Sequence, residues 1–156
     1  MNQASPTSES TARVLVISGD DDVKSFINNL MRLNRIRAGI TESIENASHF
    51  LNTNLPPDAV ILDLEPSENL ALEFLRQIRR HEKLIKLPVL VLMPIPDPTL
   101  VRQALDAGAN RYLTKAFMSQ NLLPTIQEIL RQIPPVPPRQ TASLRQSAAI
   151  STDSGG

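Results

Sequence analysis

A run of apolar residues that ends in an acid constrains this chain more than any other feature. The run is AVILDL, residues 59–64, and prolines stand on both sides of it, at Pro57 and Pro66. An unbroken apolar run this short, rich in β-branched residues, predicts a strand buried on both faces, as in a parallel sheet covered by helices. Asp63 then lies at the carboxyl end of that strand, where open α/β sheets place their chemistry.

Strand-like and helix-like patterns alternate five times along the chain. Right-handed crossovers then give a parallel sheet with helices on both faces. Pro124 lies early in the last helical pattern and is expected to delay the start of that helix. The predicted strands cover residues 14–17, 37–41, 59–64, 89–92 and 111–114. The first predicted helix is marked by a stripe of apolar residues over 23–31, and the other predicted helices cover residues 44–52, 69–81, 99–107 and 119–133.

The composition is that of one domain with tails. Of the 156 residues, 41% are hydrophobic and only 3% are aromatic, so aliphatic side chains must build the core. Sixteen basic and sixteen acidic residues cancel, which gives no electrostatic case for binding nucleic acid or a membrane surface. The chain has no cysteine, which excludes a disulfide framework and a thiolate metal site. Since neither a secretory signal nor a membrane-spanning stretch is recognisable, we expect a cytoplasmic protein.

Three segments are expected. Residues 1–12 are rich in Ser, Thr and Pro and are predicted to be disordered, and residues 13–133 form the domain. Residues 134–156 begin with PPVPP, a polyproline-type spacer, and continue as a Ser-, Ala- and Gly-rich tail that is predicted to be disordered. The PPVPP segment suits an aromatic groove, although a plain exit linker is the simpler interpretation.

Five segments in order resemble the receiver domain of bacterial response regulators. They are VLVI followed by an acid-rich turn, PPDAVILDL, LALEFLRQIRR, LPVLVLM, and ALDAGANRYLTKAF, in which Tyr112 stands three residues before Lys115. The resemblance covers residues 13–133. It implies a flavodoxin-like fold, a doubly wound five-stranded parallel sheet of order 2-1-3-4-5 with helices on both faces.

The resemblance also implies a site. Asp63 takes the position of the phosphoacceptor, which receives a phosphoryl group from a histidine kinase or a small phosphodonor. In the family, two acids at the end of the first strand hold Mg²⁺ together with the acceptor. A Ser or Thr that ends the fourth strand binds the phosphoryl group, and Lys115 matches the lysine that pairs with it. Tyr112 matches the aromatic residue that rotates inward as the switch.

This sequence departs from that pattern at several positions. The acidic pair falls on Ser18 and Gly19, and the hydroxyl position falls on Met93, whose thioether is at best a weak acceptor. One carboxylate facing one ammonium is already neutral, so Asp63 and Lys115 are expected to bridge directly without metal. No cofactor is therefore expected, and phosphorylation is predicted to be slow or absent and not to be transmitted through Met93 to the switch tyrosine.

An alternative comes from the acids at residues 20–22. Their simplest role is to cap the following helix and to complement its dipole. A bulge at Gly19 would instead swing Asp20 into the metal position, so that Asp20 and Asp63 hold Mg²⁺ in a working phosphoacceptor site. The helix stripe argues against this shift, because it would rotate Val23 and Phe26 off the core.

The favoured function is a stand-alone, degenerate receiver that acts as a protein-interaction module in two-component signalling, and not as an enzyme. The partner is a histidine kinase or a downstream effector, or a second copy in a homodimer. It would bind the face made by the fourth helix, fifth strand and fifth helix, which carries Arg102, Gln103 and Arg111. An enzyme or nucleotide binder on the same fold is disfavoured, because no Gly-rich phosphate loop and no nucleophile–base pair is present.

Overall fold

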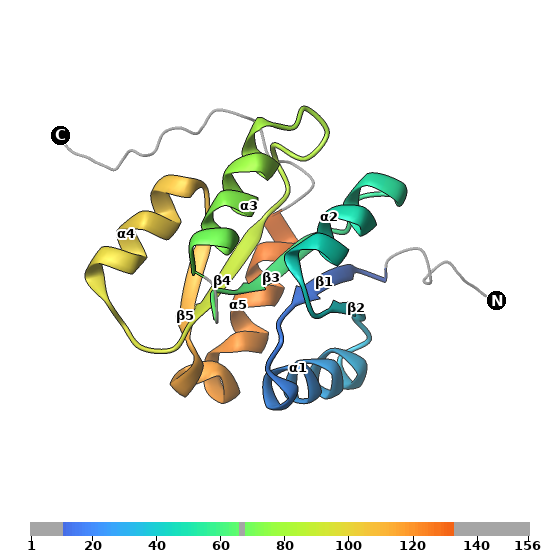
Figure 1. Ribbon diagram of the computed structural model, residues 1–156. Coiled ribbons are helices and arrows are strands. Elements are labelled where there is room, and N and C mark those ends of the chain that lie inside the picture. Colours follow the sequence, from blue (N-terminus) through green and yellow to red (C-terminus); the bar gives the residue numbers. More distant parts are fainter. Residues whose placement is uncertain (1–10, 66–67, 133–156) are drawn as a thin grey trace, which may run out of the picture.

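A five-stranded parallel sheet forms the centre of the molecule in a computed structural model, which describes residues 11–65 and 68–132 (Figure 1). The strand order is β2-β1-β3-β4-β5, so the predicted doubly wound fold is confirmed. The strands are β1 (Arg13–Ile17), β2 (Arg37–Thr41), β3 (Ala59–Asp63), β4 (Val89–Met93) and β5 (Arg111–Thr114). The helices are α1 (Asp21–Leu33), α2 (Ile44–Thr53), α3 (Glu68–Arg80), α4 (Pro98–Ala107) and α5 (Met118–Gln132), with a 3-10 turn η2 (Lys115–Phe117) before α5.

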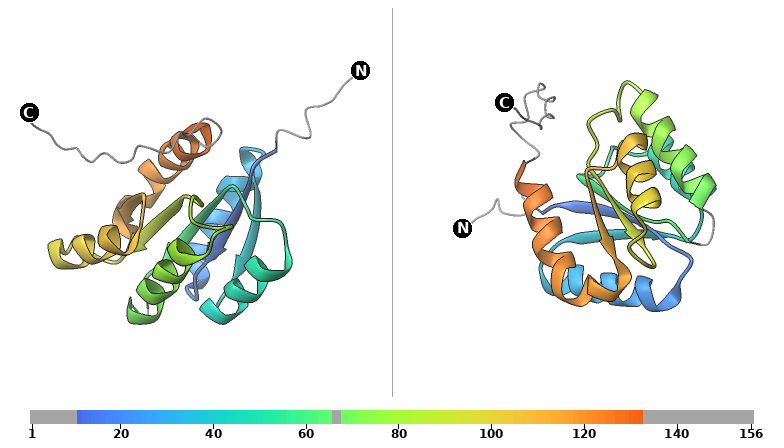
Figure 2. Two further views of the ribbon diagram at one scale, coloured as in Figure 1. Left: turned by 90° about the horizontal axis from the view of Figure 1, so that it is seen from above. Right: turned by 90° about the vertical axis from the view of Figure 1, so that its left-hand side faces the viewer.

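Helices cover both faces of the sheet and divide the core in two. The left view of Figure 2 shows α2, α3 and α4 on one side and α1 and α5 on the other. Alternate residues of each strand serve the two layers: Leu15 and Ile17 face the larger cluster, whereas Val14 and Val16 face the smaller one. All five residues of β3 and all five of β4 are buried, as the apolar runs predict.

The predicted element boundaries hold to within a few residues, with one error of interpretation. Pro124 lies inside α5, which already begins at Met118, so this proline does not delay the helix. Its side chain is exposed, while Leu122 and Ile126 of the same helix are fully buried. Packing of that apolar face therefore outweighs the one backbone hydrogen bond that proline removes. Residue Ile133, the predicted helix end, lies outside the described residues, as do residues 1–10 and 134–156.

The acids before α1 serve that helix. Asp20 is its N-cap, and the Asp20 carboxylate accepts hydrogen bonds from the backbone N–H groups of Asp22 (2.9 Å) and Val23 (3.2 Å). Asp21 and Asp22 occupy the first turn, where negative charge complements the helix dipole. The buried residues Val23, Ile27 and Met31 keep the predicted stripe on the core, so the cap and the helix register support each other.

A second polar network stands at the opposite, amino edge of the sheet. Arg79 at the end of α3 donates to the carbonyl of Gly108 (3.0 Å) and to Oδ1 of Asn110 (2.9 Å). The same Asn110 oxygen accepts the backbone N–H of Val89, the first residue of β4, at 2.7 Å. Burial lowers the pKa of Arg79 to about 10, which leaves the guanidinium charged near neutrality. This network ties α3, α4 and β4 together.

No helix within residues 11–65 and 68–132 is both long and apolar enough to cross a bilayer.

Candidate functional site

The candidate site lies at the carboxyl edge of the sheet. Asp63 ends β3, Ser18 follows β1 and Lys115 follows β5. Because β1 pairs with β3, and β4 lies between β3 and β5, these ends converge on one edge. The Asp63 residue is only 4% exposed, so it is a carboxylate that folding has nearly removed from water.

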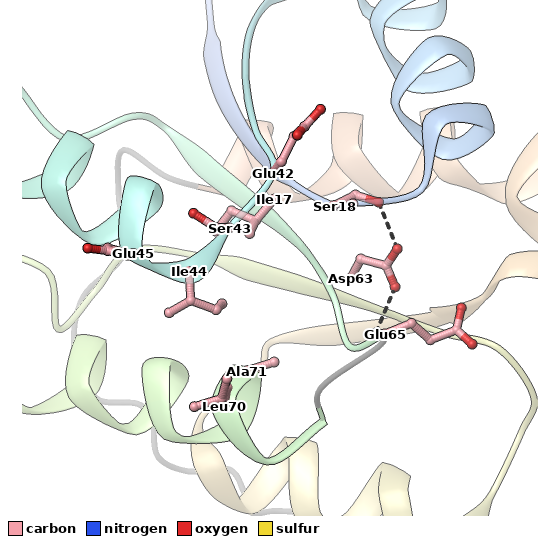
Figure 3. Close-up of a pocket in the computed structure, with 11 residues that line it drawn as sticks. Ile17, Ser18, Glu42, Ser43, Ile44, Glu45, Asp63, Glu65, Leu70 and Ala71 are labelled. Carbon is pink, nitrogen blue, oxygen red and sulfur yellow. Dashed lines mark hydrogen bonds between the residues drawn. The ribbon is translucent and has the colours of Figure 1, made fainter.

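Both oxygens of the Asp63 carboxylate are engaged (Figure 3). The Ser18 hydroxyl donates to Oδ2 at 2.8 Å, and the backbone N–H of Glu65 donates to Oδ1 at 3.0 Å. The Lys115 ammonium lies 2.9 Å from the same Oδ2. The direct bridge between Asp63 and Lys115 that charge balance suggests is therefore present. A buried carboxylate is tolerated only when it is paired and hydrogen-bonded in this way.

The Lys115 ammonium is the centre of a group of three carboxylates. Besides Asp63, it lies 2.5 Å from a Glu65 oxygen and 3.7 Å from Oδ2 of Asp20. Partial burial acts to lower the pKa of Lys115, but the hydrogen bonds and charges of Glu65 and Asp63 outweigh it, so the pKa is raised above that of an ordinary lysine. The ammonium thus supplies the positive charge that balances the acids at this edge.

Glu65 is the residue that the sequence patterns did not indicate. It lies two residues beyond Asp63 in the loop after β3, where no periodicity tells which way a side chain points. Its distance of fifty positions from Lys115 along the chain hides the contact as well. The one available signal is its negative charge, because a second acid near the end of β3 indicates that a cation is needed there to balance the two carboxylates.

Ser18 and Gly19 stand where the family pattern places two acids. Ser18 is buried, and its Oγ accepts the backbone N–H of Asp20 at 3.1 Å while donating to Asp63. Gly19 lies next to open space, since an added Cβ would meet only the Glu42 carbonyl, at 3.8 Å. Asp20 is the N-cap of α1, and its hydrogen bond from Val23 is the main reason that its pKa is lowered.

These residues do not fit the divalent metal that the family pattern implies. Within residues 11–65 and 68–132, no three His, Cys, Asp or Glu side chains are arranged to hold a metal ion. The carboxylates of Asp20, Asp63 and Glu65 instead surround the Lys115 ammonium. A metal bound at this place would have to displace that ammonium or share its ligands.

The two predicted switch positions lie on β4 and β5. Met93, the last residue of β4, is fully buried, and Thr114 of β5 is its register partner. Tyr112 is 42% exposed and lines a groove beside α4. The structure thus brings together Asp63, Lys115 and Ser18 with Asp20, but it leaves the tyrosine on the outer face of β5.

A cavity of about 320 Å³ opens beside Asp63 on the α2 and α3 side (Figure 3). Its apolar wall is made by Ile17, Ile44 and Leu70, and its acids include Glu42 and Glu45 at the start of α2. The Lys24 ammonium forms an ion pair with Glu42, so part of this negative charge is already neutralised.

The chain belongs to the response regulator receiver domain family, whose model matches residues 14–127. It is 30% identical over 128 residues to the DNA-binding dual master transcriptional regulator RpaA of Synechocystis, with 80% of this chain and 52% of that protein covered. It is 23% identical to the phosphate regulon transcriptional regulatory protein PhoB of Escherichia coli, with 80% and 54% covered. The chain therefore spans about half the length of these curated relatives.

Solved structures show the same fold. A putative response regulator from Chloroflexus aurantiacus is 28% identical, with a TM-score of 0.73 and with 78% of this chain and 99% of that chain covered. A response regulator from Thermotoga maritima is 25% identical, with a TM-score of 0.69 and with 78% and 98% covered. The resemblance seen in the sequence motifs is confirmed, and the chain carries the receiver module of two-component signalling.

Proposed function

We propose that this receiver domain is a protein-interaction module whose activity does not depend on phosphorylation of Asp63. The observation that carries the proposal is the environment of that carboxylate. It is buried, and the Ser18 hydroxyl, the Glu65 N–H and the Lys115 ammonium already satisfy it. An incoming phosphoryl dianion would face the two carboxylates of Asp63 and Glu65, with a single ammonium to offset their charge.

The positions that relay phosphorylation in the family support the same proposal. Met93 offers no hydroxyl to a phosphoryl group, and its side chain is fully enclosed by the core. Met93 therefore gives a group held at Asp63 no side-chain hydroxyl through which to move Tyr112. In this proposal the outward position of the tyrosine is a constant feature of the surface.

The proposed contact surface is the face formed by α4, β5 and α5, which lies toward the viewer in the right view of Figure 2. Arg102 and Gln103 are exposed on α4, and Arg111 begins β5. The partner class is a histidine kinase, a downstream effector or a second copy of this chain. A constitutive surface requires only that this face keep its shape, which the buried strands beneath it ensure.

A second candidate, a working phosphoacceptor, is favoured by the position of Asp20. Its Oδ2 lies 3.7 Å from the Lys115 ammonium, at the same cluster as Asp63. In this candidate Lys115 turns away from the edge, and Asp20 and Asp63 together hold Mg²⁺. To bind the metal, Asp20 must either give up its role as the N-cap of α1 or use one oxygen for the metal and the other for the cap. Its Oδ1 accepts the hydrogen bonds from the first turn of α1.

A titration with Mg²⁺ and beryllofluoride, which mimics the phosphorylated state, separates the two candidates. We expect the amide resonances of residues 61–65 to stay unchanged up to about 10 mM Mg²⁺, because no metal site lowers the cost of the added negative charge. Asp63→Asn is the control for any shift that does not involve the carboxylate. Saturable shifts in the wild type that Asp63→Asn abolishes would establish the working phosphoacceptor instead.

A further inference from the structure

The net charge of zero conceals a separation of charge between the two edges of the sheet. Each edge comprises the strand ends on that side, the connections next to them and the adjoining turn of each helix. In the described part of the chain, the carboxyl edge carries nine acids and two lysines, a net charge of −7, and the amino edge carries ten basic residues and three acids, a net charge of +7. The carboxyl edge is residues 17–24, 41–47, 63–65, 68–71, 93–101 and 114–121, and the amino edge is residues 11–13, 30–37, 50–59, 77–89, 104–111 and 129–132.

The topology explains only part of this separation. All five strands run in one direction and each helix leads back, so every helix begins at the carboxyl edge and ends at the amino edge. Acids in first turns, such as Glu68, and bases in last turns, such as Arg80, complement the helix dipoles. Helix dipoles do not account for Arg37, which begins β2, or for Lys83 and Lys86 between α3 and β4. These three side chains are exposed and form no salt bridge with the side chains that the structure describes.

Both edges also expose large apolar side chains. Six such side chains are more than half exposed in the described part of the chain, and three of them belong to each edge. They are Leu33, Leu55 and Ile85 at the amino edge, and Leu70, Ile95 and Phe117 at the carboxyl edge. Each edge therefore offers apolar surface among charges that are mainly of one sign, which suits a partner surface of the opposite sign.

We propose that this chain associates head to tail with copies of itself, so that the amino edge of one copy lies against the carboxyl edge of the next. A second copy is the occupant that the charges select, because it supplies an opposite charge of equal size to either edge. An acidic partner would match only the amino edge, and a basic partner would match only the carboxyl edge. The association depends on the two edges alone, and it holds whether or not Asp63 accepts a phosphoryl group.

The contact is heterologous, since it joins two different surfaces. Because the two edges lie at opposite ends of the strands, each added copy leaves one edge of each sign free, and the contact repeats along the strand direction. The stack covers Asp63 and Lys115 and withdraws them from a phosphodonor. The face of α4, β5 and α5 runs along the side of the stack, so a partner meets several copies of it in a row.

The strength of the contact should depend steeply on salt. Exposed ion pairs contribute little each, so the attraction is the sum of many charges at a distance. The screening length falls from about 30 Å at 10 mM ionic strength to about 8 Å at 150 mM. In sedimentation velocity of the full chain, we expect an average mass that rises above 17.2 kDa with protein concentration at the low ionic strength and stays near that value at the higher one.

Two variants weaken one edge each. Lys83→Glu/Lys86→Glu lowers the charge of the amino edge from +7 to +3, and Glu45→Lys/Glu68→Lys changes that of the carboxyl edge from −7 to −3. At low ionic strength, each variant alone should associate about tenfold more weakly than the wild type. An equimolar mixture should recover the wild-type affinity but stop at two copies, because the intact carboxyl edge of the first variant meets the intact amino edge of the second.

The matched control is Arg76→Glu/Arg102→Glu. It changes the net charge by the same amount as the lysine variant, but its two positions lie in the middle of α3 and α4, between the edges. We expect this control to associate nearly as the wild type does. The amide spectrum of each variant shows that it is folded before its mass is measured.

Three results would overturn the proposal. The first is a wild type that keeps the monomer mass at about 1 mM protein and 10 mM ionic strength, where the screening length is longest. The second is an association that both edge variants leave unchanged, which assigns the contact to another face, as in a symmetric dimer. The third is a mixture of the two edge variants that associates no more tightly than either variant alone.

Discussion

At the amino edge of the sheet, Arg79 donates to three backbone carbonyls and to the Asn110 amide oxygen. At the carboxyl edge, Lys115 contacts three side-chain carboxylates. The first network uses one cation to satisfy neutral groups that belong to the fold. The second uses one cation to hold together acids that would otherwise repel each other. The amino-edge network therefore contributes to the packing of the fold, whereas the carboxyl-edge network balances charge.

The difference teaches that the two edges of the sheet can vary independently. Ser18 and Gly19, which stand where the family pattern places two acids, lie only at the carboxyl edge, where the Ser18 hydroxyl donates to one Asp63 oxygen. Nothing at the amino edge depends on these two positions, because the two networks share no residue. Substitutions at the two edges should consequently differ in size and in their response to pH and Mg²⁺.

The largest effect is expected for Gly108→Ala at the amino edge. Gly108 has φ +118°, and an added Cβ would lie 2.5 Å from Cγ of Arg79. Backbone strain and displacement of the arginine together should lower the free energy of unfolding by about 3 kcal/mol. Urea denaturation measures the change, and Gly19→Ala, whose Cβ has space, is the matched control. Equal stability of the two variants would show that Arg79 can move at no cost.

A somewhat smaller loss is expected for Lys115→Met at the carboxyl edge. The substitution leaves the buried Asp63 without its cation and beside Glu65, so the free energy of unfolding should fall by about 2 kcal/mol. Addition of Asp63→Asn should recover part of that loss, because the uncompensated charge is then absent. The double-mutant cycle gives the coupling energy. A coupling near zero would mean that the ion pair at 2.9 Å contributes nothing to stability.

The pH dependence of the same variant sharpens the comparison. Because the folded-state pKa of Lys115 is raised, its stabilisation is complete below the ordinary lysine pKa of 10.5 and is lost as the pH rises through the folded value. The stability difference between wild type and Lys115→Met should therefore be constant from pH 7 to pH 10 and shrink above it. A difference that stays constant at higher pH would contradict the charge role of this residue.

Restoring the family acids should make the carboxyl edge respond to metal. The variant Ser18→Asp/Gly19→Asp places carboxylates beside Asp63 and should be destabilised without Mg²⁺. If it binds the ion with a Kd of about 1 mM, 10 mM Mg²⁺ adds about 1.4 kcal/mol to its stability. Wild type measured under the same conditions is expected to show no Mg²⁺ dependence. A wild type that gains as much as the variant would favour the working phosphoacceptor.

The smallest effect is expected for Asp20→Asn. Asparagine caps helices about as well as aspartate, so the loss should be about 0.5 kcal/mol, from the charge alone. The pKa of Asp20 is lowered, chiefly by the Val23 N–H, so its contribution is present above pH 3.8 and is lost as the pH falls through the folded value. The free energies of unfolding of wild type and variant should therefore converge once the pH is below the folded-state pKa of Asp20. Asp22→Asn, in the first turn of α1, is the control.

Much of the carboxyl edge could be predicted from local signals. The run that ends in Asp63 and the spacing from Tyr112 to Lys115 located the strand ends, and charge balance alone pointed to their bridge. The contribution of Glu65 could not be predicted, because the direction of a loop side chain depends on elements fifty residues away. Pro124 was misjudged for a related reason, since helix propensity is weaker than the burial of an apolar face.

The amino edge could hardly be predicted at all. A glycine after a helix suggests a stop, and Gly108 does end α4, but no pattern connects it with Arg79 on α3. By itself the sequence determined the alternation of elements, the two-sided burial of β3 and β4, and the cap of α1, because each follows from neighbours along the chain. Only the tertiary structure decided which cation meets which acid and which carbonyl, since the crossovers bring those groups together from distant positions and burial then makes each unpaired charge costly.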